Sequence, residues 1–590
     1  MEQPVSTREA YTGGNVQPVE GRDVPRVVAV LRRFEATTAV WVFVAFVLFV
    51  LILNPLYHLV LESFQLTRGQ GVEWTLRNYI KAFTEPLYRG PVLWTFIVSA
   101  AVGPLSLMVG AAVAWCVGRT DMPLPGFIRT SVLLSFVTPP FLGAIAWIFL
   151  AGPREGWLNI IYRGITGAAG HEYLFNIFTM PGVVFTMALF TFPQVFIVVL
   201  AALNNIPSDV EDAASIAGGN SLSTMVNITL PLVLPALMAG LLLAVLEAMT
   251  LLGIPAVLAI PARQHLMTTQ IRAIMDEGID AVGLAAAYSF PILVAAALLV
   301  WMQRAALGRR GYATVGGKGG HRRPQKLGVW RYPVFAMCMV PVTCAIVLPY
   351  FALIATSFMK NLGHGLTWSN MTLENYRSIF QSRAIASSMV NTLLLATMAA
   401  TGATLLASVI AYISQRQLVH GHRHLGLLAT LPLGIPGIVL GVGLFAAYTK
   451  APFVLYGTLW ILFLAYVTKF LPLAYQASNA ALMSIHPELE ESGRILGANR
   501  LTVFKDVTVP LFKVGLLASW LLVFMPSLRE LSTSALIWTI DTKVISVVIL
   551  NLYDEARLAD IAALGVILMI VTLAVVVCVF RMMGRDFMRA

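Results

Sequence analysis

Four ionisable side chains stand inside otherwise apolar stretches of this sequence. Glu247 lies in LLAVLEAMTLL, Lys469 in FLAYVTKFLPLAY, and Arg529 and Glu530 in FMPSLRELSTSAL. Charges are costly in such surroundings, so those that occur there often line a path for an ion or a substrate, or pair with one another. Two interpretations are open. Either Glu247 and Glu530 line a gate that a cation passes, or Lys469 pairs with Glu247 or a carbonyl and Arg529 with its neighbours.

A second pattern with charged residues occurs twice. EDAASIAGGNSLSTMVNITLP begins at Glu211, and EESGRILGANRLTVFKDVTVP begins at Glu490. We call these stretches the first and second acidic segments (residues 211–231 and 490–510). Acidic side chains stabilise the N-terminal end of a helix, which carries a partial positive charge. A glycine allows the left-handed turn that ends a helix. Each copy therefore predicts a short helix, a turn at Gly218 or Gly497, and a second helix.

Other patterns with catalytic or metal-binding potential are weak. The string GYATVGGKGG is nearest to a phosphate-binding Walker A loop, but Lys318 is followed by Gly319 instead of Ser or Thr. A possible metal site is suggested by the spacing of His420, His422 and His424, because imidazole is a common metal ligand. However, no Cys or carboxylate is close in the sequence to complete the site. We therefore expect no metal site, no cofactor held by this chain and no enzymatic activity of its own.

The composition places these residues in a membrane protein. The 590 residues are 58% hydrophobic and 12% charged, whereas an average soluble domain has about 25% charged residues. The net charge of +11 is explained by basic residues that collect on the cytoplasmic side of membrane proteins, so no nucleic-acid partner is expected. The apolar runs are continuous and not alternating, which indicates helices that lie in the lipid bilayer.

Twelve apolar runs are long enough to cross a bilayer. With the N-terminus inside, most of the 40 Lys and Arg residues fall on the inner side, which predicts that both termini are cytoplasmic. The expected spans are residues 38–61, 92–117, 127–150, 179–203, 231–252, 282–303, 332–356, 387–413, 425–447, 455–482, 511–532 and 560–581.

The spans fall into two homologous halves of six. TLRNYIKAF at Thr75 matches TLENYRSIF at Thr372, and Thr95 matches Thr392 at the same offset. The expected division is an N-terminal tail (1–36), a first repeat (37–305), a basic Gly-rich linker (306–329) and a second repeat (330–590). VTPPFL and GIPGIVLG, in the third span of each half, predict matched breaks. Such breaks either line a pathway or are tolerated by packing against neighbouring helices.

The acidic segments resemble the cytoplasmic EAA signature of the permeases of ABC importers. That signature reads acid-Ala-Ala, three residues, Gly, nine residues, Ile-x-Leu-Pro. The first segment fits it with Asp212 as the acid, and the second has Ser492 and Gly493 in place of the alanines. In that family the segment is a helix that inserts into a cleft of an ATPase subunit. The resemblance implies an ATPase-coupling role for Glu211, Asp212, Ala213, Ala214, Gly218, Glu490, Glu491 and Gly497.

Twelve spans with both segments in one chain look like the fused permeases of the ferric-iron type. The resemblance implies an all-α, type I ABC-importer permease fold in the bacterial cytoplasmic (inner) membrane. It also implies two copies of an ATPase that carries ATP and Mg, an extracytoplasmic solute-binding protein, and alternating access. Ferric iron is the expected cargo, and thiamine, phosphonate or polyamine are alternatives. A 6+6 secondary transporter is a further alternative, but it does not explain the twin acidic segments.

Overall fold

The structure, a computed structural model, describes residues 36–68, 71–206, 213, 216–218, 220–308, 324–364, 367–419 and 421–583. In these ranges, ten helices are long and apolar enough to cross a membrane. Two further helix pairs pass the same test but are bent by 102° and 109°. The predicted all-α membrane fold is confirmed, with up to twelve spans if each bent pair counts as one. The one sheet among these residues is a hairpin of two strands.

The first half follows this order in the chain: α2 (Ala36–Leu48), η1 (Phe49–Leu53), α3 (Asn54–Ser63), β1 (Gln65–Arg68), β2 (Gly71–Trp74), α4 (Arg77–Thr84), α5 (Pro86–Arg119), α6 (Pro125–Val137), α7 (Pro140–Ala151), α8 (Trp157–Thr166), α9 (Met180–Asn204), α11 (Ser221–Thr224), η2 (Met225–Thr229), α12 (Leu230–Thr250), η3 (Pro255–Ala259), α13 (Met267–Asp276), η4 (Ile279–Ala281), α14 (Val282–Tyr288) and α15 (Phe290–Gly308).

The second half repeats most of this order: η5 (Gly328–Trp330), α16 (Arg331–Val342), η6 (Thr343–Val347), α17 (Leu348–Ser357), η7 (Leu362–His364), η8 (Trp368–Asn370), α18 (Glu374–Gln381), α19 (Arg383–Gln415), α20 (His422–Thr430), η9 (Leu431–Gly434), α21 (Gly437–Tyr448), α22 (Leu459–Met483), α23 (Pro487–Ile495), α24 (Arg500–Val503), η10 (Phe504–Thr508), α25 (Val509–Leu528), α26 (Ser534–Ile537), η11 (Ile540–Thr542), α27 (Ile545–Asp554) and α28 (Leu558–Met583).

The repeat that is visible in the sequence recurs in detailed contacts. The Thr95 hydroxyl accepts a hydrogen bond from the main-chain N–H of Met267 at 2.8 Å, and Thr392 accepts one from Ile545 at the same distance. Each bond joins the long second span of a half to the first residue of its α13 or α27. The matched threonines therefore mark a shared packing point, which explains why the motif is present in both halves.

The third span of each half is broken, as the prolines predict. Pro140 opens α7 and Gly437 opens α21, and each follows a proline in extended conformation that caps the new helix. A proline has no N–H to continue the preceding helix, so the chain turns there instead of running straight through. Nearly every residue of α7 and all of α21 are buried. The break thus places a short apolar helix in the centre of each half.

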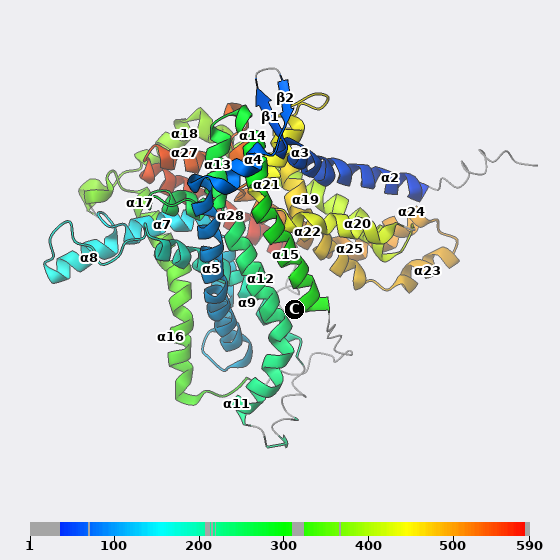
Figure 1. The fold of residues 1–590 in the computed structure, drawn as a ribbon. Helices are drawn as coiled ribbons and strands as arrows, with labels where there is room; N and C mark the ends of the chain where they lie inside the picture. Colours follow the sequence, from blue (N-terminus) through cyan, green and yellow to red (C-terminus); the bar gives the residue numbers. More distant parts are fainter. Residues whose placement is uncertain are drawn as a thin grey trace, which may run out of the picture.

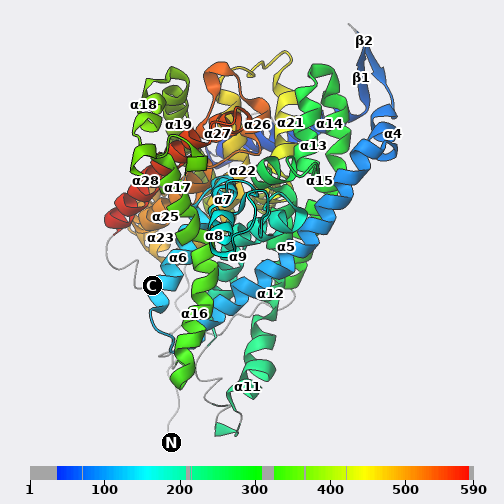
Figure 2. The same ribbon diagram turned by 90° about the vertical axis from the view of Figure 1, so that its left-hand side faces the viewer.

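The two halves exchange their first spans. In the first half, α5, α9 and α12 pack together, and in the second half α19, α22 and α25 form the equivalent bundle. However, α3 packs against α21 of the second half. In turn, α17 packs against α7 of the first half, as Figure 2 shows. Each half is therefore completed by a helix of the other, and the two cannot separate as independent bundles.

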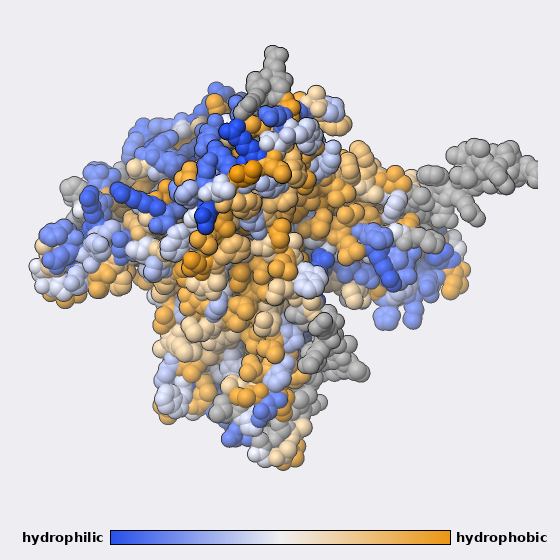
Figure 3. Space-filling view, viewed as in Figure 1, coloured by the Kyte–Doolittle hydropathy of each residue, from blue (hydrophilic) through white to orange (hydrophobic). Residues whose placement is uncertain are grey.

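The bundles diverge toward the acidic segments. Figure 1 shows α11 and α23 at separate corners of the molecule, whereas α13 and α27 lie close together at the opposite end. Hydrophobic side chains cover the middle of the surface in Figure 3, and hydrophilic ones gather near α4 and α18. The halves therefore meet at the end that carries α13 and α27, and they open at the end that carries the acidic segments.

Candidate functional site

The second acidic segment folds into two helices joined at Gly497. α23 has Pro487 in its first turn together with the acids Glu488 and Glu490. Gly497 has a φ of 91°, in the left-handed region that a glycine adopts without steric cost. Asn499 then caps the next helix, because its Oδ1 accepts a hydrogen bond from the main-chain N–H of Thr502 at 2.8 Å. This copy has the helix–turn–helix that its sequence predicts.

The described part of the first acidic segment follows the same path. Gly218 has a φ of 87°, and Asn220 Oδ1 accepts a hydrogen bond from the main-chain N–H of Ser223 at 2.8 Å. The N–H of Ala217 donates to the carbonyl of Ala213 at 3.0 Å, as in a helical turn. The remaining predicted coupling residues of this copy lie outside the described residues: Glu211, Asp212 and Ala214.

Each turn presents a large apolar side chain to solvent. Ile216 is 88% exposed and Ile495 is 85% exposed, and the two stand at equivalent positions of the two acidic segments. Leu496, next to Ile495, is 88% exposed. Isolated exposed apolar residues are common, but here the same residue is exposed at the equivalent place of both repeats.

The two neighbouring acids of the second segment have opposite surroundings. Glu490 is buried, and its carboxylate faces Arg416 at the end of α19. Glu491 is exposed to solvent. Successive residues of a helix point about 100° apart, so once α23 docks on its own half only one of the pair remains available to a partner.

Lys469 pairs with Glu530 in the second half. The Lys469 Nζ lies 2.7 Å from Glu530 Oε1, and the Glu530 side chain is only 1% exposed. The same carboxylate accepts hydrogen bonds from the main-chain N–H groups of Thr533 and Ser534 and from the Ser534 hydroxyl, at 2.7–3.0 Å. A buried carboxylate is tolerated when its charge and its lone pairs are satisfied in this way.

Arg529 reaches across to the first half. Its Nη1 donates to the carbonyl of Thr138, at the break of the third span, at 3.0 Å. Its guanidinium also lies over the ring of Phe136, 5.1 Å from the ring centre, in a cation–π contact. The Thr138 hydroxyl is hydrogen-bonded to Tyr350 OH at 2.7 Å. Arg529 therefore ties the end of α25 to the broken span of the other half.

Glu247 of α12 completes the group of intramembrane charges. It stands beside Gln194 of α9 and lies within electrostatic reach of Arg529 and Lys469. The structure thus pairs Lys469 directly with Glu530 and leaves Glu247 opposite Arg529. Two acids and two bases meet at the boundary between the halves, and their formal charges cancel.

An ion-pair network joins the halves beyond the spans. Arg272 of α13 lies 3.7 Å from Asp276 on its own helix and 3.4 Å from Asp554 at the end of α27. Asp276 and Asp554 occupy equivalent positions in the repeat, so one arginine bridges a symmetry-related pair of acids. Burial raises the pKa of Asp276, Arg272 opposes this shift, and the negative Asp554 adds to it. Nearby, Tyr553 OH donates to the carbonyl of Val257 at 2.8 Å.

The described residues offer no obvious metal cage. In those ranges there is no group of three His, Cys, Asp or Glu side chains arranged to hold an ion. His422 Nδ1 lies 2.9 Å from the carbonyl of Val419, and His420 lies outside the described residues.

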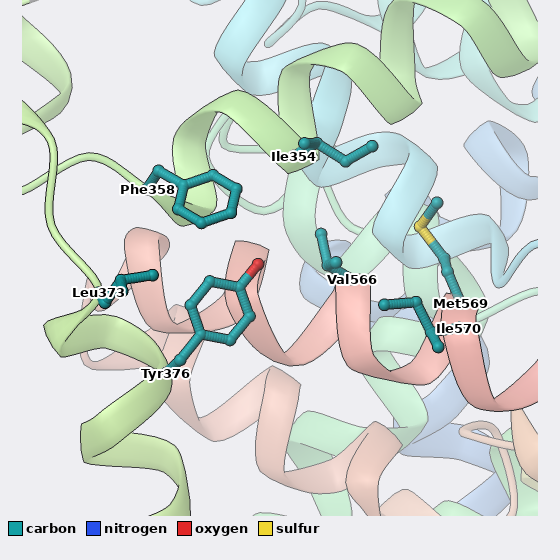
Figure 4. A pocket seen from close by; sticks show the side chains of 7 residues that line it. All are labelled: Ile354, Phe358, Leu373, Tyr376, Val566, Met569 and Ile570. Carbon is teal, nitrogen blue, oxygen red and sulfur yellow. The ribbon is translucent and has the colours of Figure 1, made fainter.

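One surface hollow among the described residues is apolar. It has a volume of about 480 Å³ and lies between α17, α18 and α28, as Figure 4 shows; its lining residues are Ile354, Phe358, Leu373, Tyr376, Val566, Met569 and Ile570. The Tyr376 hydroxyl already has a hydrogen-bond partner, because it donates to Ser357 Oγ at 2.8 Å. This hollow therefore lacks ligands for a small charged solute.

Several residues of the site were missed by the sequence interpretation. Arg416, Thr138 and Arg272 all bind charged or polar partners that are far away in the sequence. One signal was available: Arg416 has a counterpart in the first half, Arg119, at the offset that relates the two matched threonines of the long second spans. Thr138 and Arg272 have no such counterpart, and only the packed structure identifies them.

Comparison with known proteins assigns most of the chain to a family of transport permeases. The family described as "Binding-protein-dependent transport system inner membrane component" matches residues 39–310 and 423–585. The ferric transport system permease protein of Actinobacillus pleuropneumoniae is 27% identical over 486 residues, which cover 82% of this chain and 69% of that protein. A putative ferric transport system permease protein of Haemophilus influenzae is 26% identical, over 76% of this chain and 70% of that protein.

A shorter relative matches less of the chain. The spermidine/putrescine transport system permease protein of Haemophilus influenzae is 25% identical over 239 residues, which cover 40% of this chain and 92% of that protein. Its length corresponds to about one half of the present chain. The family match covers both halves and most of the spans. This chain belongs to the family of binding-protein-dependent transport system inner membrane components and is a multi-pass permease of the inner membrane.

Proposed function

We propose that this chain is the permease of an ATP-driven importer of ferric iron. The observation that carries the choice of cargo is the extent of the likeness. Two relatives named for ferric transport match 82% and 76% of the chain, across both halves. The relative named for spermidine and putrescine matches 40%. Iron is cargo here, delivered by a separate binding protein and not retained by the permease.

Two copies of an ATPase subunit drive the cycle, one on each acidic segment. The duplicated tips support this stoichiometry, because Ile216 and Ile495 are equally exposed at equivalent positions. An apolar knob flanked by the acidic residue Glu491 suits a groove with an apolar floor and a basic rim. ATP and Mg belong to the ATPase, and this chain carries no cofactor. Asp212 is the counterpart of Glu491 in the first segment.

The acidic segments and both termini face the cytoplasm in this proposal. The binding protein then docks at the opposite end, around α4 and α18, where Figure 3 shows hydrophilic side chains. ATP binding draws the two acidic segments together and separates the halves at α13 and α27. Hydrolysis allows the halves to return to the arrangement described here, which is closed at that end.

The charged cluster acts as the gate. In the closed arrangement, Arg529 bridges to Thr138 at 3.0 Å, and its positive charge opposes the passage of a bare cation. Separation of the halves breaks this bridge and leaves Glu247 free to face the path. Carboxylate oxygens are ligands that hard cations prefer, so Glu247 can lower the barrier when the gate is open. Lys469 and Glu530 neutralise each other and hold the wall of the gate.

An uptake comparison tests the cargo. The permease is reconstituted in liposomes with its ATPase, and each candidate solute is supplied with its binding protein at equal concentration. We expect ATP-dependent uptake of ferric iron that exceeds uptake of thiamine, spermidine or 2-aminoethylphosphonate. Preferential uptake of any of these three would overturn the iron assignment and leave the importer assignment in place.

A further inference from the structure

Glu490 is held by side chains from two different spans. Arg416, the last residue of the α19 region, donates through Nη2 at 2.9 Å and through Nε at 3.1 Å to Glu490 Oε1. The hydroxyl of Thr508, in η10, donates to the same oxygen at 3.0 Å. Tyr412 OH donates to Glu490 Oε2 at 3.3 Å. The Arg416 and Glu490 side chains are only 12% and 10% exposed, so this is a largely dehydrated, charge-assisted contact.

The contact joins α23 to the helices that cross the membrane. Arg416 and Tyr412 belong to the end of α19, while Thr508 directly precedes α25. These two helices and α22 form the bundle of the second half. Arg416 Nη2 also donates to the carbonyl of Ile485 at 3.2 Å, just before α23 begins. Glu490 thus lies at the point where α23, α19 and α25 meet.

Apolar packing around Glu490 reinforces this junction. The rings of Tyr412 and Phe504 meet edge to face, with centroids 4.9 Å apart. A Cβ added at Gly493 would lie only 3.1 Å from the Val503 side chain, so α23 and the following helix pack closely there. A packed junction of this kind moves as a unit, since neither an ion pair nor a close-packed contact deforms gradually.

The same residue types recur in the first half of the sequence. Arg119 matches Arg416 at the offset of the paired threonines in the long second spans, and Thr229 matches Thr508 at the offset of the two acidic segments. Arg119 and Thr229 are buried, at 7% and 1% exposure. Glu211 opens the first acidic segment as Glu490 opens the second. The two halves differ at most positions, yet an arginine, a threonine and a glutamate recur at matched places of the sequence.

We infer that Glu490 is a positioning residue which, with Arg416 and Thr508, fixes α23 rigidly to α19 and α25 and so transmits the movement of the ATPase to the membrane spans. Glu491, Ile495 and Leu496, on the exposed side of the same segment, contact the ATPase. The inference rests on the proposed function, because the ATPase supplies the force. It divides the second acidic segment into an inner side that transmits force and an outer side that binds the partner.

Reconstituted transport gives the first test. Glu490→Gln and Arg416→Gln are compared with Glu488→Gln, which changes an exposed acid of the same helix. We expect the Glu490→Gln and Arg416→Gln permeases to retain the ATPase during purification and to hydrolyse ATP. The amount of iron moved per ATP should fall about three- to thirtyfold, the range found for mutations along coupling networks. If both variants moved as much iron per ATP as the wild type, the inference would be overturned. It would also be overturned if a variant no longer bound the ATPase although α23 was still folded, because Glu490 would then act in binding.

A distance measurement gives a second test that needs neither ATPase nor iron. Spin labels are placed at Glu488→Cys on α23 and Leu405→Cys on α19, both exposed, in a chain whose four native cysteines have been replaced. We expect a narrow distance distribution that broadens in Glu490→Gln and broadens less in the milder Thr508→Val. An equally narrow distribution in Glu490→Gln would overturn the rigid junction. Because no partner is present, this result is independent of whether the importer proposal holds.

Discussion

Arg529 of one half donates a hydrogen bond to the main-chain carbonyl of Thr138 in the other, with the two atoms 3.0 Å apart. The acceptor is available because the chain breaks at Pro139 and Pro140, which leaves the carbonyl of Thr138 outside a continuous helix. The broken span therefore has a purpose beyond irregular packing. It provides a polar contact in the membrane that joins the two halves.

Removal of this contact should open the gate. A hydrogen bond from a charged donor contributes about 1.5–3 kcal/mol, so Arg529→Met should increase the open fraction about tenfold or more. Leu531 is buried beside Gly253 of the first half and serves as a reporter. In a cysteine-free background, Leu531→Cys should react about tenfold faster with a membrane-impermeant thiol reagent when Arg529 is replaced. An unchanged reaction rate would contradict the gate, and Arg383→Met, at an exposed arginine, is the control.

The stability of the protein should depend on the charge balance between Lys469 and Glu530. Lys469→Met leaves a 1% exposed carboxylate without its counter-charge, which should destabilise the protein by about 3–5 kcal/mol. The double variant Lys469→Met/Glu530→Gln removes both charges and should recover much of that loss. Thermal unfolding in detergent, followed by size-exclusion chromatography, measures the effect. Equal stability of the single and double variants would show that Lys469 does not neutralise Glu530.

Acidification should increase the stability of the folded protein through Asp276. The pKa of Asp276 is raised above its ordinary value by burial and by Asp554, so the folded protein binds a proton there more tightly than the unfolded chain. Stability should therefore increase as the pH falls from neutral toward the ordinary carboxyl pKa of about 3.9. Asp276→Asn should raise the midpoint of thermal unfolding at neutral pH and flatten this part of the pH profile. Asp280→Asn, at an exposed acid nearby, should leave the profile as it is.

The exposed tips should determine binding of the ATPase. Ile495→Asp places a charge at a side chain that is 85% exposed in the free permease, so the fold should tolerate it. At a buried interface the same charge would have no partner, and affinity should fall about tenfold or more. Ile216→Asp should have the same effect on the second ATPase copy. Co-purification of the ATPase measures both, and normal binding in the double variant would rule out these tips as docking sites.

Much of the fold could be predicted because lipid imposes simple constraints. Continuous apolar runs had to be helices, and the Pro-rich motifs at Pro139, Pro140 and Pro436 indicated where two of them break. The exchange of α3 and α17 between the halves was not predictable. Lipid tails are as apolar as the side chains of these helices, so hydrophobicity does not determine which bundle a span joins.

The partners of the charged residues also required the structure. Lys469 could have paired with Glu247 or with a carbonyl, and the rotation of α22 in its bundle selects Glu530 instead. Likewise, the sequence presents Glu490 and Glu491 as equivalent neighbours. Only the docking of α23 on Arg416 shows that Glu490 faces inward. The sequence thus identifies which residues are unusual, while the packing determines what each of them contacts.

The importer proposal is tested most directly by measuring which energy source drives uptake. Proteoliposomes that contain the permease, its ATPase and its binding protein are supplied with ferric iron, and iron uptake is followed with and without ATP. Ionophores then collapse all ion gradients while ATP is maintained. Uptake should require ATP and should continue at an unchanged rate after the gradients are lost. Uptake without ATP, or uptake that stops when the gradients collapse, would contradict the importer proposal and would indicate a secondary transporter.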